Sequence, residues 1–216
     1  MQAETENLIA VSRASADVAA SELDHEAWTS AQPVLISRYW SGAEAPPERR
    51  AEARLLWSTA ALHVRFVCPQ LEPLVVSATP QTGQKSLGLW DRDVCEIFIA
   101  TDASRPESYY EFEAAPTGEW LDLKIHWTAE ARETDWEYHS GMTTGASIGA
   151  RRVRVAMRIP WEALDHSPQA GQLWRANLFR CVGADPHRGY LAWQPTHTPE
   201  PSFHLPQAFG WLRFEE

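Results

Sequence analysis

Cysteine is scarce in this chain, with three residues among 216. Cys68, Cys95 and Cys181 stand far apart in apolar segments, form no Cys-x-x-Cys pair and have no adjacent histidine. The sequence therefore offers neither a disulfide framework nor a cysteine zinc site. We expect three buried free thiols in a single domain spanning residues 1–216, which is long enough to bury a core without cross-links.

Positive charge is also in short supply, since 19 lysines and arginines stand against 29 acidic residues, a formal net charge of -10. A nucleic-acid-binding protein needs a clustered positive surface that displaces counterions from phosphates, so this class is excluded. Apolar runs such as residues 94–100 fall well short of the roughly 20 residues that cross a bilayer. Residues 1–6 show no basic and apolar leader, so we expect a soluble, cytoplasmic protein without membrane contact, or a secreted one if a leader has been trimmed.

Local catalytic motifs are missing as well. The sequence contains no Gly-x-Ser-x-Gly, no Gly-x-Gly-x-x-Gly, no phosphate-binding loop and no His-Glu-x-x-His. Its eight histidines form no pair with the spacing of metal ligands. Nucleotide-dependent, zinc-dependent and serine-hydrolase chemistry therefore has no local support.

Strict alternation of apolar and polar residues is what the sequence has in abundance, and this period places every second side chain on one face of a strand. The clearest case is 152–159, with one aliphatic and one cationic face. Related patterns predict strands at 53–59, 62–68, 94–101, 109–115, 121–127, 173–182 and 210–214. Helical periodicity is confined to 22–27 and 160–164. Many short strands without long helices predict an all-β, antiparallel β-sandwich of jelly-roll or immunoglobulin-like type with one or two short helices.

Tryptophan is unusually frequent, with 11 residues. Trp90 begins segment 90–100, where an unbulged strand would place it on the same face as Glu96. A flat ring beside a carboxylate suits a sugar, which offers C–H groups on its flat side and hydroxyls around its edge. The structural alternative is that Trp90 only packs at a sheet edge.

Two further acids and one histidine are candidate binding residues. Glu111 and Glu113 share one strand face, and neighbouring like charges favour a cation, an arginine partner or open solvent. Arg180 or the arginines of segment 152–154 are candidate partners. His204 lies in the loop before the last predicted strand, where a hydrogen-bonded structural role is the alternative to a binding role.

Short segments in a fixed order carry a family resemblance. They are RLLW at 54–57, ALHV at 61–64, LWDRDVCEIFI at 89–99, YYEFE at 109–113, IPW at 159–161, WRANLFR at 174–180, AW at 192–193 and FHLPQAFG at 203–210. Together they resemble a family 9 carbohydrate-binding module of the DOMON-like β-sandwich group. The similarity runs over most of the chain.

The resemblance implies a non-catalytic module that, in its xylanase-linked members, holds the end of a glucan or xylan chain between two tryptophans, so a mono- or oligosaccharide is the expected partner. By position, Trp90 matches the first ring, Phe203 the second, and Glu96 a carboxylate that hydrogen-bonds the sugar. A phenylalanine at the second ring position is a departure from this pattern. A family arginine falls near Glu113 and a family glutamine near Phe179, which departs from the pattern. The candidate ligand-binding residues are Trp90, Glu96, Glu113, Arg180, Phe203 and His204. Calcium is structural in some members and its ligands do not map here; no other cofactor is expected, and we expect a monomer.

Three alternatives stay open. DOMON-like domains include haem-binding cytochromes with a Met/His type of axial pair, for which Met142 and Met157 are the internal methionines. The fold could also be a scaffold that has lost sugar binding. A glycoside-active enzyme would need two carboxyl groups about 5–10 Å apart across a cleft. Its candidate carboxyl groups are those of Asp91, Asp93, Glu96, Glu111 and Glu113.

Overall fold

The computed structural model describes residues 7–216, so the prediction about a leader, which concerns residues 1–6, falls outside the described residues. This part of the chain forms fourteen strands and five 3-10 helices. The strands are β1 (Leu8–Arg13), β2 (Val34–Ile36), β3 (Arg38–Tyr39), β4 (Ala51–Trp57), β5 (Ala61–Pro69), β6 (Val94–Ala100), β7 (Ser108–Ala114), β8 (Trp120–Trp127), β9 (Arg132–Asp135), β10 (Thr143–Ile148), β11 (Arg152–Pro160), β12 (Leu173–Val182), β13 (Gly189–Ala192) and β14 (Gly210–Phe214). The helices are η1 (Glu26–Thr29), η2 (Pro47–Arg49), η3 (Leu89–Asp91), η4 (Trp161–Leu164) and η5 (Pro206–Ala208).

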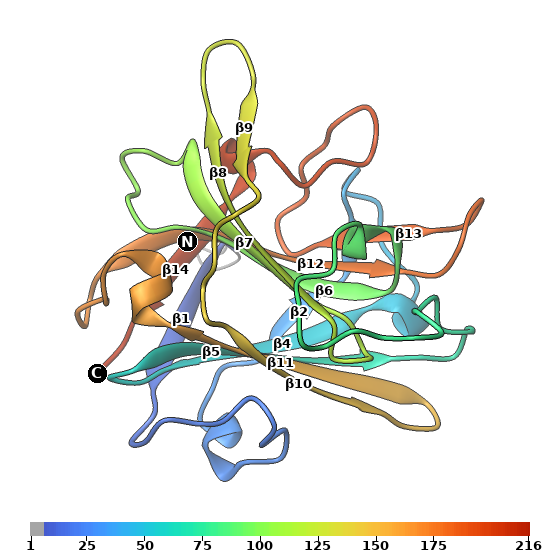
Figure 1. Ribbon diagram of the computed structural model, residues 1–216, viewed down its shortest axis with the longest axis horizontal. Coiled ribbons are helices and arrows are strands. Elements are labelled where there is room, and N and C mark those ends of the chain that lie inside the picture. The colour runs from blue at the N-terminus through green and yellow to red at the C-terminus, as the bar shows by residue number, and fades with distance from the viewer. Residues whose placement is uncertain (1–6) are drawn as a thin grey trace.

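The strands build two facing sheets (Figure 1). One has the order β10-β11-β5-β4, with β2 also on β4. The other has the order β14-β12-β6-β7-β8-β9, with β13 beside the second half of β12 and β3 beside β13. β1 joins the two, because it pairs in parallel with β14 and then with β4. The predicted sandwich is therefore confirmed, with β1 as the parallel exception to antiparallel pairing.

The main core lies between the two sheets. Trp174 is fully buried there, with its ring 4.8 Å from that of Phe214. The side chains of Cys68 and Cys95 meet in the same core with their sulfur atoms 3.7 Å apart, and all three cysteines are buried and free, as predicted. Burial of these apolar surfaces is the principal driving force for stacking the sheets.

A second apolar layer covers the opposite face of the β12-β6-β7-β8 sheet. Alternate residues of these strands, such as Phe98 and Phe179, point away from the main core and pack under the loop that follows β13. Phe203 and Phe209 of that loop complete the layer. The long segment 194–208 is therefore an ordered cover over one sheet face, and the candidate site lies beneath it.

η4 lies within the predicted helical range 160–164, whereas η1 shares only residues 26–27 with the predicted range 22–27, and each is a single 3-10 turn. None of the helices formed by residues 7–216 has the length and apolar character needed to span a bilayer.

Gly145 in β10 gives a first test of the packing, because a Cβ added there would overlap the backbone carbonyl of Ala20. We expect Gly145→Ala to lower the free energy of unfolding by about 1–3 kcal/mol, as overpacking does elsewhere. Gly83→Ala is the control, since its added Cβ meets no atom within 4 Å. Urea denaturation that finds the two variants equally stable would show that β10 does not pack against Ala20.

Candidate functional site

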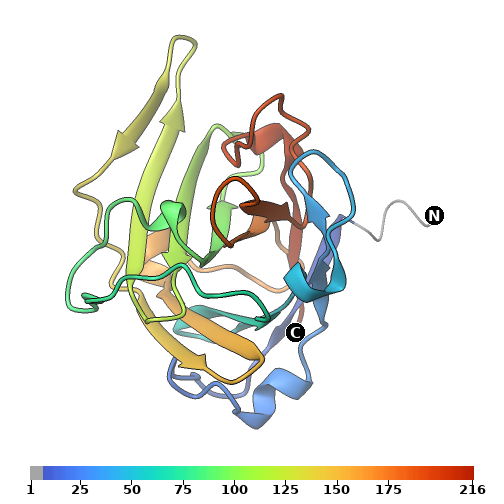
Figure 2. The same ribbon diagram turned by 90° about the vertical axis from the view of Figure 1, so that its right-hand side faces the viewer.

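A cavity of about 300 Å³ opens on the covered face of the β6-β7-β8 sheet. The β8–β9 hairpin extends beyond the body of the protein on this side (Figure 2), and β9 supplies part of the wall. The lining residues combine aromatic rings, acids and a few hydrogen-bond donors: Trp90, Asp91, Glu96, Phe98, Glu111, Leu123, Ile125, Arg132, Thr134, Trp136, Cys181, Tyr190, Pro201, Ser202, Phe203 and His204. Four of the six predicted binding residues therefore line one cavity.

Trp90 reaches the cavity from a turn instead of a strand. It lies in η3, which follows Gly88 in a left-handed conformation with φ of 74°. We predicted that Trp90 and Glu96 share a face because both lie on one strand. This argument was wrong, because β6 begins only at Val94. Both side chains nevertheless line the same cavity. Trp90 is 37% exposed, so part of its ring is open to solvent.

Trp136 is a second exposed ring that the sequence analysis missed. It follows β9, is 45% exposed, and its ring centroid lies 6.4 Å from that of Trp90, with the planes tilted by 50°. The sequence did contain a signal for this residue, since Trp136 stands in the polar run 133–137. Exposure of a large apolar ring is unfavourable, so a tryptophan among polar residues indicates a binding role.

Phe203 forms a wall of the cavity. Its ring stacks on Phe179 with centroids 4.0 Å apart and an angle of 11° between the planes, and only 8% of the residue is exposed. One ring face is therefore already used in packing. The prediction that Trp90 and Phe203 hold the sugar between them is therefore not supported by this packing. Trp136 is the exposed aromatic ring beside Trp90.

His204 lines the cavity, and one hydrogen bond holds its ring. Its Nδ1 lies 2.9 Å from the hydroxyl of Tyr109, which also accepts the indole N–H of Trp127 at 3.3 Å. Burial, with a smaller contribution from Arg132, lowers the pKa of His204 to about 3, so the ring is neutral. Nε2 lies 3.9 Å from Oε2 of Glu111, too far for a direct hydrogen bond.

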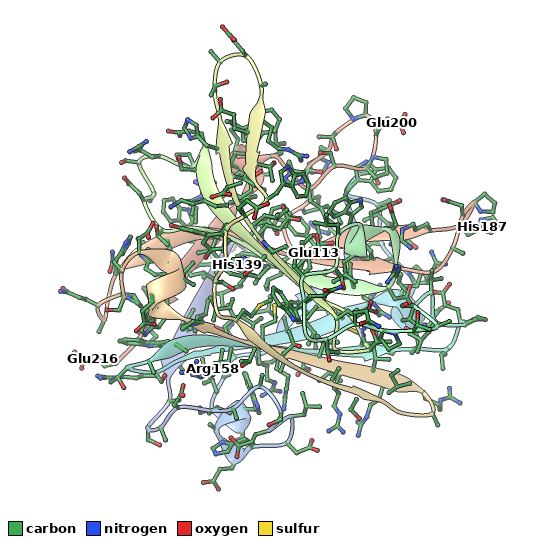
Figure 3. All side chains as sticks on the ribbon, in the orientation of Figure 1. Glu113, His139, Arg158, His187, Glu200 and Glu216 are labelled. Atoms are coloured by element: carbon green, nitrogen blue, oxygen red, sulfur yellow. The ribbon has the colours of Figure 1, made fainter. Side chains whose placement is uncertain are left out.

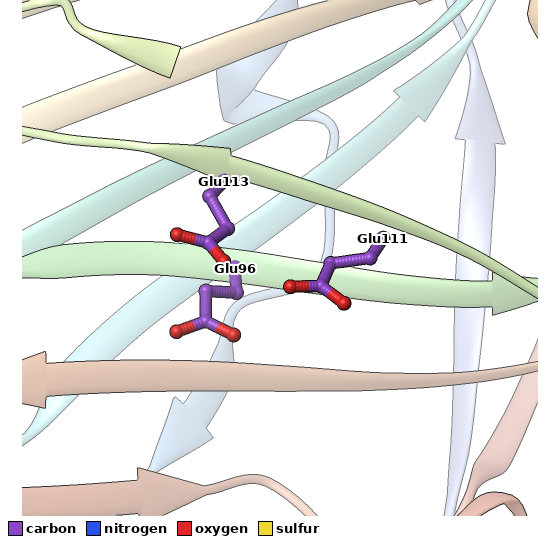
Figure 4. A group of neighbouring side chains, drawn as sticks. All are labelled: Glu96, Glu111 and Glu113. Atoms are coloured by element: carbon purple, nitrogen blue, oxygen red, sulfur yellow. The ribbon is translucent and has the colours of Figure 1, made fainter. Parts of the chain in front are cut away.

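Three buried glutamates form the floor of the cavity and the layer behind it (Figure 4). Glu96 of β6 pairs directly across the ladder with Glu113 of β7, and Glu111 lies two residues along. Burial and then the nearby Glu111 raise the pKa of Glu96 to about 8. Burial also raises the pKa of Glu111, and burial with both neighbouring acids raises the pKa of Glu113 far above its usual range. The thiol of Cys181 donates to Oε1 of Glu96 at 3.4 Å.

These features, aromatic rings over a polar floor in one cavity of an all-β sandwich, agree with the comparison of the sequence with known families. The model of the family described as "Carbohydrate family 9 binding domain-like" matches residues 21–216. The chain belongs to this family. No curated protein sequence matches the chain at a significant level.

Solved structures of similar fold include two family 9 modules. A proposed carbohydrate-binding protein from Bacteroides uniformis has 19% identity and a TM-score of 0.73, covering 97% of this chain and 99% of that one. A Caldicellulosiruptor kristjanssonii module in complex with cellotriose has 17% identity and a TM-score of 0.68, with 96% and 93% covered. A module from the same organism in complex with glucose has 16% identity and a TM-score of 0.66, with 96% and 95% covered. At these identities the likeness establishes the shared fold.

In this family 9 domain, Arg180 lies outside the cavity, contrary to the prediction. It belongs to the β12 face that looks into the sandwich, where its guanidinium donates to the carbonyls of Arg49, Arg50 and Pro69 at 2.8 Å and to Oε1 of Gln70 at 2.9 Å. The side chain is 2% exposed. Arg180 therefore ties the end of η2 and the end of β5 to β12, and it contacts neither Glu111 nor Glu113.

Two further predictions were wrong: that Glu113 contacts the ligand, and that the arginines of segment 152–154 pair with Glu111 or Glu113. Glu113 is fully buried behind Glu96 and does not line the cavity, and Figure 3 places it near the middle of the molecule. Arg154 lies in the other sheet and pairs with Asp24, so this row does not reach the acids. A direct sugar contact by Glu113 is therefore not supported by the geometry.

The other predicted acids have separate places in the family 9 domain. Asp91 lines the cavity together with Glu96. Asp93 is buried and accepts the backbone N–H groups of Gly183 at 2.7 Å and Val75 at 3.3 Å, so it fixes two loops.

The haem alternative finds no support in this cavity. Met142 and Met157 both belong to the core between the sheets. Of the residues that the structure describes, His204 is the histidine in the cavity lining, and no methionine accompanies it there. A Met/His axial pair is therefore not presented by this site.

Proposed function

We propose that the protein is a non-catalytic carbohydrate-binding domain that takes the end of a mono- or oligosaccharide into the cavity beside Trp90 and Trp136. The observation that carries the proposal is the pair of exposed indole rings over a hydrogen-bonding floor in one cavity. Membership of carbohydrate family 9 supports it, as do the related folds that hold cellotriose and glucose.

The site can satisfy both sides of a pyranose ring. The faces of Trp90 and Trp136 receive its C–H groups, since burial of apolar surface against an aromatic plane is favourable. Arg132 and Thr134 of β9 can donate hydrogen bonds to hydroxyl oxygens, and Glu96 and Glu111 can exchange hydrogen bonds with the hydroxyls. Because each sugar hydroxyl must first lose water, dissociation constants of about 1 μM to 1 mM are expected.

The decisive experiment is calorimetric titration of wild type and Trp90→Ala with glucose, cellobiose, cellotriose and xylobiose. We expect at least one sugar to bind the wild type and Trp90→Ala to bind it at least tenfold more weakly, about 1.4 kcal/mol. Trp211→Ala is the matched control, because Trp211 packs beside Arg175 outside the cavity. Equal affinity of wild type and Trp90→Ala would place the sugar elsewhere.

Non-catalytic action has its own test. A panel of aryl glycosides is expected to show no turnover by the purified protein. Turnover that disappears in Glu96→Gln would establish a glycoside-active enzyme instead, since a glycosidase depends on its carboxyl pair.

A further inference from the structure

The three glutamates below the cavity have no basic partner among the hydrogen bonds of the described residues. Both carboxyl oxygens of Glu113 and Oε2 of Glu111 are buried and accept no hydrogen bond from outside this group of three acids. A carboxylate is buried without partners only at a high cost, and three side by side also repel one another. The group therefore needs compensation, either by bound protons or by a cation.

The geometry suits a small cation. Glu96, Glu111 and Glu113 each offer one carboxyl oxygen, and these oxygens all lie within 4.8 Å of one another. An ion at their centre would lie about 3 Å from each, and hard divalent cations bind carboxylate oxygen at about 2.0–2.6 Å, so a small side-chain adjustment completes the contacts. The carboxyl groups converge from two adjacent strands (Figure 4), and Glu96 and Glu111 line the cavity, which gives an ion a path from solvent.

We propose that the floor of this cavity binds a hard divalent cation, Ca²⁺ or Mn²⁺, through Glu96, Glu111 and Glu113. Oxygen ligands select this class of metal. Two charges of the ion offset most of the three carboxylate charges. The guanidinium of Arg188 adds positive charge from a fixed position, since it donates to the carbonyls of Gly183, Trp90 and Arg92.

Three protein oxygens leave coordination positions open, and the two ligands that line the cavity, Glu96 and Glu111, bring the ion within reach of the cavity. Water fills them in the absence of ligand, and sugar hydroxyls can replace that water. This part of the inference rests on the proposed function. It makes sugar binding by this domain dependent on the metal.

Terbium luminescence tests the metal site directly. Tb³⁺ is a hard cation, and indoles close to it sensitise its emission. Metal-free wild type is expected to show saturable emission with one ion bound, reversed by Ca²⁺ or Mn²⁺. Glu113→Gln is expected to bind at least tenfold more weakly. Glu162→Gln, at an exposed position of η4, is the control with unchanged binding.

Wild type alone can overturn the metal site, which protects the test against a variant that does not fold. Calorimetry in which neither Ca²⁺, Mn²⁺ nor Tb³⁺ binds metal-free wild type refutes it. Binding by folded Glu113→Gln that equals wild type also refutes it. A rise in the thermal midpoint of wild type with Ca²⁺ or Mn²⁺, absent in Glu113→Gln, supports it.

Sugar titrations with and without a chelator separate this inference from the proposed function. A loss of at least fivefold in sugar affinity on metal removal supports the coupling, and unchanged affinity refutes it. Metal binding without any sugar binding leaves the cation site standing and refutes the proposed function. Binding of glucosamine but not glucose by metal-free protein would show that the acids take the ammonium group of the ligand, which overturns the metal proposal.

Discussion

Arg180→Met is expected to lower the free energy of unfolding by about 3–5 kcal/mol while folded protein keeps its sugar affinity within about twofold. The guanidinium donates four hydrogen bonds, to the backbone carbonyls of Arg49, Arg50 and Pro69 and to the side chain of Gln70. Buried acceptors that lose their donor cost about 1–3 kcal/mol each, and rearrangement recovers part of the total. Urea denaturation and calorimetry on the same preparation measure the two effects.

Arg213→Met is the matched control for Arg180→Met. Arg213 forms an exposed ion pair with Glu215, so its loss is expected to change stability by less than about 1 kcal/mol. If Arg180→Met kept its stability but lost sugar affinity, Arg180 would be a ligand contact and its assigned place in the sandwich would be wrong.

Acid is expected to destabilise the protein through His63, by about 3 kcal/mol between pH 6.5 and pH 4. His63 is buried at 1% exposure, with Nε2 3.2 Å from Oγ of Ser58. Burial lowers its pKa from 6.5 to about 4, the nearby Asp17 opposes this shift and Arg158 adds to it. Below pH 6.5 the unfolded chain therefore takes up a proton that the folded protein does not, and stability is lost as the pH falls towards 4.

The contribution of His63 is measured as a difference between variants, because other groups titrate in the same range. Urea denaturation of wild type and His63→Asn at pH 7, 5.5 and 4.5 is expected to show a smaller acid loss in the variant. His139→Asn, at an exposed position, should follow the wild type. Parallel pH curves for wild type and His63→Asn would show that His63 is not the acid-sensitive group.

Alternation predicted the strands that have a well-defined buried face. β5 and β11 pair over their full lengths and both alternate clearly, so their positions could be read from the residues. β9 could not, because its four residues carry no buried side chain, and β10 is a weak pattern around Gly145. β1 was not predicted. Its buried residues Ile9 and Val11 alternate over only six residues, which is a short pattern.

The candidate site was only partly readable from the sequence. Alternation within β6 correctly placed Glu96 on the sheet face opposite Cys95 and Ile97, which belong to the core between the sheets. Arg180 could not be placed in this way, because β12 is buried on both faces and its apolar neighbours do not distinguish them. Trp136 lies beyond any strand pattern, so only the fold of the β8–β9 hairpin brings it to Trp90. The expected monomeric state and cytoplasmic location stay predictions.

The parallel pairing of β1 has a consequence for how the protein is made. Leu8 lies opposite Trp211, about two hundred residues later in the chain, and β1 is also the strand that ties the two sheets together. A ribosome must therefore synthesise β14 before its pairing with β1 can form, and until then that edge of β1 is open to pairing with other strands. A pairing between strands so far apart in the sequence is expected to lower the folding rate.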